Sequence, residues 1–416
     1  MTPEIKQRIE QMRRGEVPEG YVKKRKVVIP QQWGLPQIKD IASISSGSTP
    51  NRNNSEYWNG NIAWVTTGEL SSGHVNHTSE LITVKAVKET KMRIYPQGTL
   101  LMAMYGQGKT RGTVAILEID AAVNQACAAI TVKDGKSKFL FYQLKNSYQD
   151  IRKLSNTGNQ ENLNADIIKT YQVPWAPDEE QERISTILTT QDKVIKLKEK
   201  RLAEKQRQKK YLMQQLLTGK KRLPGFYGAW SFPKAKELFQ SVSDKDHNGD
   251  LAVLSSTQDR GIVPRDEVDI DIKYDACSLV NYKKVSKGNF VISLRSFQGG
   301  IEYSTYTGLV SPAYTVLSSR KEISDGYYKQ FFKSTDYINR LNVAVYGIRD
   351  GKQISYEDFG RLRIPNPPIK EQDAIAEVLS TADHEIDLLQ QDIEQEKQKK
   401  KALMQLLLTG IVRVKT

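Results

Sequence analysis

The stretch EQERISTILTTQDKVIKLKEKRLAEKQRQKKYLMQQLLTGKKR occupies residues 180–222 and recurs in diverged form at residues 371–413, as EQDAIAEVLSTADHEIDLLQQDIEQEKQKKKALMQLLLTGIVR. The two copies align without a gap at an offset of 191 residues, with 18 identities in 43 positions. A repeat of this length indicates a chain built from two equivalent halves.

Both copies have the spacing of a long helix with an apolar seam. Apolar residues recur at alternating intervals of three and four, which is the heptad pattern of a coiled coil. The predicted seam consists of Ile184, Leu188, Ile195, Leu202, Leu212 and Leu216 in the first copy, and of Ile375, Leu379, Ile386, Leu389, Ile393, Leu403 and Leu407 in the second.

The charges of the two copies indicate that these helices pair with each other. Residues 193–210 carry nine Lys or Arg against two Glu, whereas residues 383–396 carry six Asp or Glu and no Lys or Arg. Opposite charges favour this pair over pairing of either helix with itself, and a two-fold repeat favours an antiparallel arrangement. The alternative is that each helix packs only on its own globule.

The repeat extends beyond the helices. Lys23–Arg25 is followed eight residues later by Trp33, and Lys220–Arg222 is followed eight residues later by Trp230. The sequence therefore predicts an α+β protein in which two globular domains are joined by two long antiparallel helices with pseudo-two-fold symmetry. The predicted boundaries are 1–22 for an N-terminal extension, 23–177 for the first domain, 178–219 for the first helix, 220–368 for the second domain and 369–416 for the second helix.

Short strands and amphipathic helices are expected inside each globule. A Gly-rich turn separates two β-branched, apolar runs in the first domain, which predicts a hairpin. The predicted strands are Thr99–Tyr105, Thr113–Ile119, Ala129–Val132, Phe290–Leu294 and Ala313–Leu317, and the predicted helices are 139–154 and 326–341.

Composition limits the possible partners and the compartment. The 416 residues carry a net charge of +14 with a pI of about 9.4, which favours a polyanion, and nucleic acid first. There is no apolar run of about 18 residues and no signal-peptide pattern, so no membrane association is expected. The two cysteines lie in different halves, which argues against a disulfide framework and for a reducing compartment.

Motifs that resemble catalytic signatures fail their context tests. Residues 103–110 fit a relaxed phosphate-binding loop, but a strand-like run follows where that loop requires a helix. Residues 366–369 read Asn-Pro-Pro-Ile and lack the aromatic residue of adenine methyltransferases. Four scattered histidines define neither a metal site nor a catalytic set. We therefore expect no catalytic centre, no metal and no cofactor on this chain.

Loop residues able to hydrogen-bond to base edges are the candidate DNA contacts. The turn at 106–111 and its counterpart near 295–300 are the strongest pair, although a solvated loop is the alternative for any single residue. The first-domain candidates are Thr49, Arg52, Asn53, Thr66, Gln107, Lys109, Arg111, Asn159 and Gln160, and the second-domain candidates are Gln258, Arg260, Arg295, Gln298, Arg349 and Lys352.

The order of these elements resembles the specificity (S) subunit of type I restriction–modification systems. The resemblance is carried by the motif at Trp33–Pro36, the Glu-Gln pairs that open both helices and the Leu-Leu-Thr-Gly runs that close them. It implies two target-recognition domains, each reading one half of a bipartite, asymmetric DNA sequence, with the helices as a spacer that fixes the gap.

The resemblance also implies the partners. The S subunit has no catalysis of its own and carries two methyltransferase (M) subunits, which methylate adenine with S-adenosylmethionine. In the full complex it also carries restriction (R) subunits, in a prokaryotic cytoplasm. The alternatives are a coiled-coil adaptor without specific DNA readout, and an enzyme that joins recognition and methylation in one chain.

Overall fold

The computed structural model describes residues 2–106, 108–154, 162–268, 276–344 and 354–414. The chain divides into two compact units. Unit 1 contains residues 1–197 and 393–416, and unit 2 contains residues 198–392. Each unit is α+β, as predicted, and each holds part of both long helices, α7 (Asp178–Leu216) and α13 (Ile369–Leu407).

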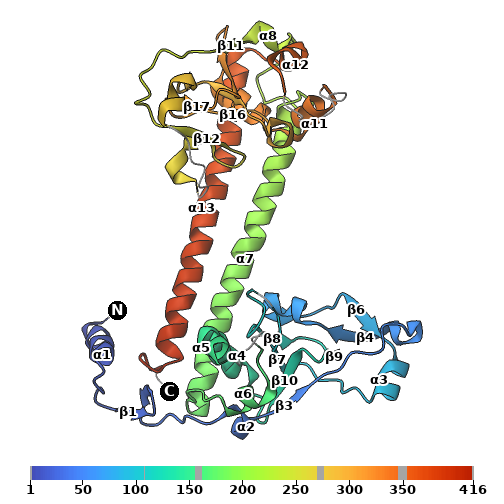
Figure 1. Ribbon diagram of the computed structural model, residues 1–416, viewed down its shortest axis with the longest axis vertical. Helices are drawn as coiled ribbons and strands as arrows, with labels where there is room; N and C mark the ends of the chain where they lie inside the picture. Colours follow the sequence, from blue (N-terminus) through green and yellow to red (C-terminus); the bar gives the residue numbers. More distant parts are fainter. Residues whose placement is uncertain (1, 107, 155–161, 269–275, 345–353, 415–416) are drawn as a thin grey trace. The chain divides into compact units, whose positions relative to one another are not determined.

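The described residues of unit 1 form a five-stranded sheet, a three-stranded sheet and the two-stranded ribbon β1-β2 (Figure 1). Its strands are β1 (Tyr21–Lys24), β2 (Val27–Pro30), β3 (Ala42–Ser46), β4 (Trp58–Val65), β5 (His74–Val75), β6 (Glu80–Ile82), β7 (Leu100–Ala103), β8 (Val114–Leu117), β9 (Ala121–Val123) and β10 (Cys127–Val132). Its helices, besides the long pair, are α1 (Pro3–Arg13), α2 (Ile38–Ile41), η1 (Ser55–Tyr57), η2 (Thr67–Ser72), α3 (Val84–Thr90), α4 (Ser137–Asn146), α5 (Tyr148–Lys153) and α6 (Ala165–Thr170).

The larger sheet of unit 1 has the order β3-β10-β7-β8-β5, and the smaller has the order β6-β4-β9. The predicted hairpin is confirmed, because β7 and β8 pair antiparallel with Leu100 opposite Ile116. The strands of this hairpin are buried on both faces, since apolar residues fill every position. Helix α4 covers the larger sheet, and the buried Phe139 contacts Trp33 and Trp175 edge to face.

Unit 2 has a main sheet like that of unit 1, but its smaller sheets differ. Its strands are β11 (Phe239–Val242), β12 (Leu254–Thr257), β13 (Gly261–Pro264), β14 (Lys283–Val285), β15 (Phe290–Ile292), β16 (Glu302–Tyr303), β17 (Gly308–Val310) and β18 (Thr315–Ser319). Its helices are α8 (Ala235–Leu238), η3 (Arg265–Glu267), η4 (Ala276–Asn281), α9 (Ser296–Gly299), α10 (Asp325–Phe331), α11 (Thr335–Ala344) and α12 (Tyr356–Arg361).

The main sheet of unit 2 has the order β11-β18-β15-β16, which matches β3-β10-β7-β8 of unit 1 strand for strand. The predicted strands at 129–132, 290–294 and 313–317 correspond to β10, β15 and β18. An aromatic cluster fills the core, where the ring of Phe239 contacts Phe290, Tyr328, Phe332 and Phe359. The internal repeat is therefore present in the fold as well as in the sequence.

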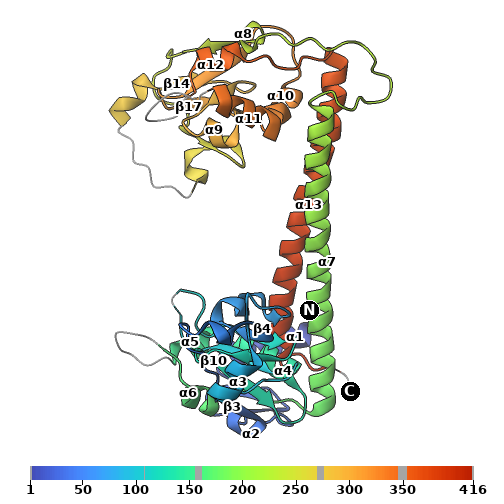
Figure 2. The same ribbon diagram turned by 90° about the vertical axis from the view of Figure 1, so that its right-hand side faces the viewer.

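The long helices pair antiparallel within each unit (Figures 1 and 2). In unit 1, Lys400 of α13 pairs with Asp192 of α7. In unit 2, Lys198 Nζ lies 2.8 Å from Asp392 Oδ1, and Lys205 Nζ lies 2.6 Å from Glu385 Oε2. The residue numbers in α7 increase along these pairs while those in α13 decrease, so the two helices are antiparallel. The predicted pairing of the basic helix with the acidic one is confirmed.

The predicted seam residues of both helices lie away from solvent, and the alternative of packing on a globule holds at the helix ends. Every predicted seam residue is buried or half-buried. Ile184 and Leu188 belong to the core of unit 1, whereas Ile375 and Leu379 belong to the core of unit 2. Leu216, at the end of α7, belongs to the core of unit 2, and Leu407, at the end of α13, belongs to the core of unit 1. Each helix therefore begins in one domain core and ends in the other, and the ion pairs join the two helices in between.

The sequence prediction was wrong about two helices. Each of the segments 139–154 and 326–341 was expected to be a single helix, but each forms two, α4 with α5 and α10 with α11. In unit 1 the chain bends at Ser147, and α5 then contacts the β7–β8 turn through Tyr148 and Arg152. A straight continuation of α4 would leave that turn without this support.

Candidate nucleic-acid interface

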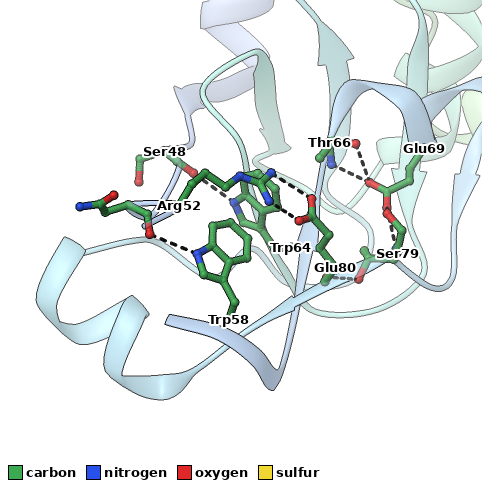
Figure 3. A network of polar contacts seen from close by, with 10 residues as sticks. Ser48, Arg52, Trp58, Trp64, Thr66, Glu69, Ser79 and Glu80 are labelled. Atoms are coloured by element: carbon green, nitrogen blue, oxygen red, sulfur yellow. Dashed lines mark hydrogen bonds and ion pairs between the residues drawn. The ribbon is translucent and has the colours of Figure 1, made fainter. Parts of the chain in front are cut away.

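In the first domain, a loop at residues 47–54 is fastened to the sheet β6-β4-β9 by two tryptophans (Figure 3). Trp58 Nε1 donates to the carbonyl of Asn51 at 3.1 Å, and Trp64 Nε1 donates to the carbonyl of Ser48 at 3.1 Å. The loop begins at Gly47, where a Cβ would lie 1.7 Å from the Val123 carbonyl oxygen, so only glycine allows this approach.

Arg52, a predicted DNA contact, lies on this aromatic surface. Its guanidinium carbon is 4.2 Å from the ring centroid of Trp58 and 5.0 Å from that of Trp64. Its Nη2 donates to Glu80 Oε2 at 3.0 Å, and its Nη1 donates to Glu80 Oε1. The Arg52 side chain is still 53% exposed. The guanidinium is thus held in one orientation while remaining accessible.

The other first-domain candidates in this region have mixed roles. Thr49 donates to the side chain of Gln125, and Asn53 is exposed. Thr66 forms the capping box of η2 with Glu69, since its backbone N–H donates to Glu69 Oε2 at 2.6 Å. That geometry assigns Thr66 a structural role at the start of η2.

The β7–β8 turn contains Lys109 and Arg111, and α5 holds it from outside. Tyr148 Oη donates to the Lys109 carbonyl at 2.6 Å, and Arg152 donates to the carbonyls of Gly108 and Arg111, both at 2.8 Å. Lys109 is exposed, but Arg111 is only 7% exposed. This burial favours a role for Arg111 in supporting the turn over a contact with DNA.

In the second domain, four candidates lie on two neighbouring loops. Gln258 and Arg260 are in the β12–β13 turn, and Arg295 and Gln298 lie at α9, between β15 and β16. All four residues are exposed. The β15–β16 connection occupies the same place in its sheet as the β7–β8 turn, as the sequence repeat predicted.

Lys333, which sequence reasoning missed, ties these two loops together. Its Nζ donates to the Gln258 carbonyl at 3.1 Å and to the Gly299 carbonyl at 2.9 Å, and pairs with Glu302. The ammonium has three hydrogens, and these three acceptors use all of them. Burial raises the pKa of Glu302 to about 7, an effect that Lys333 only partly offsets.

Five further candidates, Gln107, Asn159, Gln160, Arg349 and Lys352, lie outside the described residues. Within the described part of the chain, no group of three or more His, Cys, Asp or Glu is arranged to hold a metal ion. Nor does that part contain a helix whose length and hydropathy would let it cross a membrane.

The repeated ends of the two helices form the same contacts in each unit. Glu180, at the start of α7, accepts from Trp33 Nε1 at 2.9 Å and from Arg413, beyond the end of α13, at 2.7 and 2.9 Å. In unit 2, Glu371 accepts from Trp230 Nε1 at 3.0 Å and from Arg222 Nη2 at 2.6 Å. We call these contacts the unit 1 clamp and the unit 2 clamp.

Both clamps are completed by a glycine. Gly219 and Gly410 each have a φ of +72° after the last helical turn, a conformation that favours glycine. A Cβ on Gly219 would lie 3.2 Å from the Trp230 ring, and one on Gly410 would lie 2.5 Å from Pro30. Glu180 aligns with Glu371, and Arg222 aligns with Arg413, at the offset of 191 residues. This identity was the signal in the sequence that could have identified the Glu–Arg contacts.

Comparison with known proteins identifies the family. The model of the type I restriction modification DNA specificity domain matches residues 30–207 and again residues 229–398. The chain belongs to the type I restriction–modification DNA specificity family. The two matched ranges contain the main sheet of each unit, the candidate DNA-contact loops and most of the two long helices, so the family match covers the repeat unit twice.

Individual specificity subunits are similar over different lengths. The MjaIX specificity subunit of Methanocaldococcus jannaschii is 34% identical over 178 residues, which cover 41% of this chain and 40% of that protein. The MjaVIII specificity subunit of the same organism is 24% identical over 419 residues, 93% of this chain and 94% of that protein. This chain therefore matches nearly the full length of the MjaVIII subunit.

Solved structures show the same fold. The type I restriction–modification S subunit from M. genitalium covers 93% of this chain and 98% of its own, with a TM-score of 0.56 and 13% identity. A chain from a study of complex assembly and conformational transition of the type I system covers 92% and 99%, with a TM-score of 0.59 and 15% identity. A coiled-coil adaptor without DNA readout is not favoured by a specificity-family match in both halves.

Proposed function

We propose that this chain is the non-catalytic DNA-reading subunit of a type I restriction–modification complex, and that each domain reads one half of a bipartite, asymmetric target in double-stranded DNA. The observation that carries this proposal is the contrast between frame and loops. The two domains share a strand order, whereas the loops at corresponding sheet ends present different side chains. Two different readers on one frame are what an asymmetric target requires.

The long helices act as the spacer that sets the gap between the half-sites. Their pairing supports this role, because the buried Ile195, Ile386 and Ile393 and a series of ion pairs together hold one helix against the other. The two clamps hold the repeated helix ends in the same way, and we propose these equivalent ends as docking places for two M subunits. S-adenosylmethionine would bind those partners, R subunits would join them in the full complex, and the assembly would act in a prokaryotic cytoplasm.

The spacer is tested by shortening both helices together. Removal of one heptad from each, residues 199–205 and 385–391, keeps the seam in phase and shortens the pair by about 10 Å, or roughly three base pairs. Methylated sequences mapped across the genome, in cells with and without the chain, should show both half-sites unchanged and a shorter gap. Altered half-sites with an unchanged gap would refute the ruler.

A control variant separates length from local contacts. The double substitution Lys205→Ala and Glu385→Ala removes one exposed ion pair without changing either helix length. The gap should then stay as it is in the parent chain. DNA binding should also weaken steeply as salt rises, since phosphate contacts release counterions; an affinity independent of salt would favour the adaptor instead.

A further inference from the structure

We propose that Arg52 reads a guanine in the half-site bound by the first domain, and that Trp58, Trp64 and Glu80 are positioning residues for this contact. The inference rests on the proposed DNA-reading function and adds the residue and the base. The starting observation is the way the guanidinium is held: its carbon lies within 5.0 Å of the centroids of both indole rings, and a carboxylate accepts from both Nη atoms (Figure 3).

The carboxylate leaves one edge of the guanidinium available. Glu80 engages the two Nη atoms from the end of the fork. A guanidinium has five N–H groups, so the edge formed by Nε and one Nη keeps a parallel pair of donors. In the described part of the chain, no residue accepts from the Arg52 Nε–H. Such a donor pair matches the N7 and O6 acceptors of guanine in the major groove.

The platform holds Arg52 in place before DNA arrives. Trp64 lies opposite Glu80 across the β4–β6 ladder, and Trp58 lies opposite Ile82, so one sheet supplies both the stacking surface and the carboxylate. The indoles meet edge to face at a centroid distance of 5.2 Å. A long side chain fixed in this way loses less conformational entropy when it binds a base.

Charge favours a base over a phosphate as the ligand. The bidentate pair with Glu80 balances the charge of Arg52, and the hydrogen bond raises the Arg52 pKa and lowers the Glu80 pKa. A phosphate approaching the open edge would meet the Glu80 carboxylate nearby and be repelled. Guanine is neutral and presents two acceptors, so it gains the hydrogen bonds without this repulsion.

The test uses the chain in complex with its methyltransferase partners, on the target mapped by methylation. Each guanine of the target is replaced in turn by 7-deazaguanine, which lacks the N7 acceptor. The replacement should lower the affinity about tenfold at one position of the target, as expected for loss of an arginine–guanine contact. In the variant Arg52→Met, which keeps an apolar stem on Trp58, that replacement should have no further effect.

Arg260→Met is the matched control. Arg260 is an exposed arginine of the second domain that also pairs with a carboxylate, Glu267, at 3.9 Å. This variant should keep the full effect of 7-deazaguanine at the position read by Arg52. An effect that disappears in both variants would overturn the assignment, because it would reflect general weakening of the complex.

Three other outcomes also overturn the proposal. One is that no single guanine is sensitive, and another is that Arg52→Met keeps the sensitivity. The third is that Arg52→Met weakens all DNA sequences equally and lowers the salt slope by about one, which identifies a phosphate contact. A parent complex with no sequence preference at all would instead refute the proposed DNA-reading function, and this result differs from all three.

Glu80→Gln tests the positioning role separately. The amide keeps one hydrogen-bond acceptor for Arg52 and removes the negative charge. Discrimination at the sensitive guanine should fall, and affinity for unrelated DNA should rise several-fold, because Arg52 becomes an unbalanced cation. Unchanged discrimination and unchanged nonspecific affinity would show that Glu80 does not position Arg52.

Discussion

The two target-recognition domains have the same sheet and hold their loops in different ways. In the first domain, the loop at 47–54 is held by the buried Trp64 and the half-buried Trp58 and Glu80. In the second, the ammonium of the half-buried Lys333 joins the β12–β13 turn to α9. The main sheet therefore has the same strand order in both domains. The side chains that hold the candidate DNA-contact loops differ between the two domains.

The clamps should be the most sensitive shared feature. Glu180 and Glu371 are fully buried and each accepts from an arginine and a tryptophan. Substitution of either by Ala leaves these donors without their carboxylate and should cost about 3–5 kcal/mol in the free energy of unfolding. Chemical denaturation of the two single variants checks this, and losses differing by several kcal/mol would show that the clamps are not equivalent.

The second domain alone should show a pH dependence from Glu302. Its pKa is about 7 in the folded state and 4.5 when unperturbed, so the stability from this group is present below pH 4.5 and is lost as pH rises through 7. Between pH 5 and pH 8 the free energy of unfolding of this domain should fall by on the order of 2–3 kcal/mol.

Glu302→Gln is the control for that dependence. The amide does not titrate, so the slope between pH 5 and pH 8 should largely disappear for the second domain and stay unchanged for the first. Hydrogen exchange of β15 and β18 resolves the second domain from the first. A slope that persists in the variant would assign the dependence to other groups.

Lys333→Met should uncouple the reading loops of the second domain. Without the ammonium, the carbonyls of Gln258 and Gly299 lose a shared donor, and both loops gain freedom. Discrimination at one half-site should fall about tenfold, as for one lost base contact, while the half-site affected by Arg52→Met keeps its selectivity. Binding to DNA with single base changes measures both, and an equal loss at both half-sites would contradict a local role.

The smallest expected effect is that of Arg260→Ala on stability. Arg260 and Glu267 are about half exposed and 3.9 Å apart, so the pair is screened by solvent. Its removal should change the free energy of unfolding by less than about 1 kcal/mol. Thermal unfolding checks this, and a larger loss would mean that this arginine supports its loop as strongly as Lys333 does.

Sequence reasoning predicted the repeated sheet and the helix pair, but it did not predict which candidate DNA-contact residues are enclosed or act as caps. The hairpin at β7–β8, the seam through Ile184 and the pairing of Lys205 with an acidic helix follow from local patterns. The burial of Arg111 and the capping role of Thr66 do not, because a polar residue in a Gly-rich or loop segment has the same sequence pattern whether it is exposed or enclosed.

The sequence by itself determined the repeated architecture. Helix periodicity and charge can be recognised in local segments, and the repeat can be recognised by aligning the chain with itself at a fixed offset. Only the tertiary structure decided which side chains meet across long separations. Arg52 meets Glu80 because Trp58 and Trp64 of β4 hold its loop and the β4–β6 register places Glu80 opposite Trp64; a shift of one residue would turn Glu80 to the other face of the sheet. Arg413 meets Glu180 because the end of one helix lies beside the start of the other.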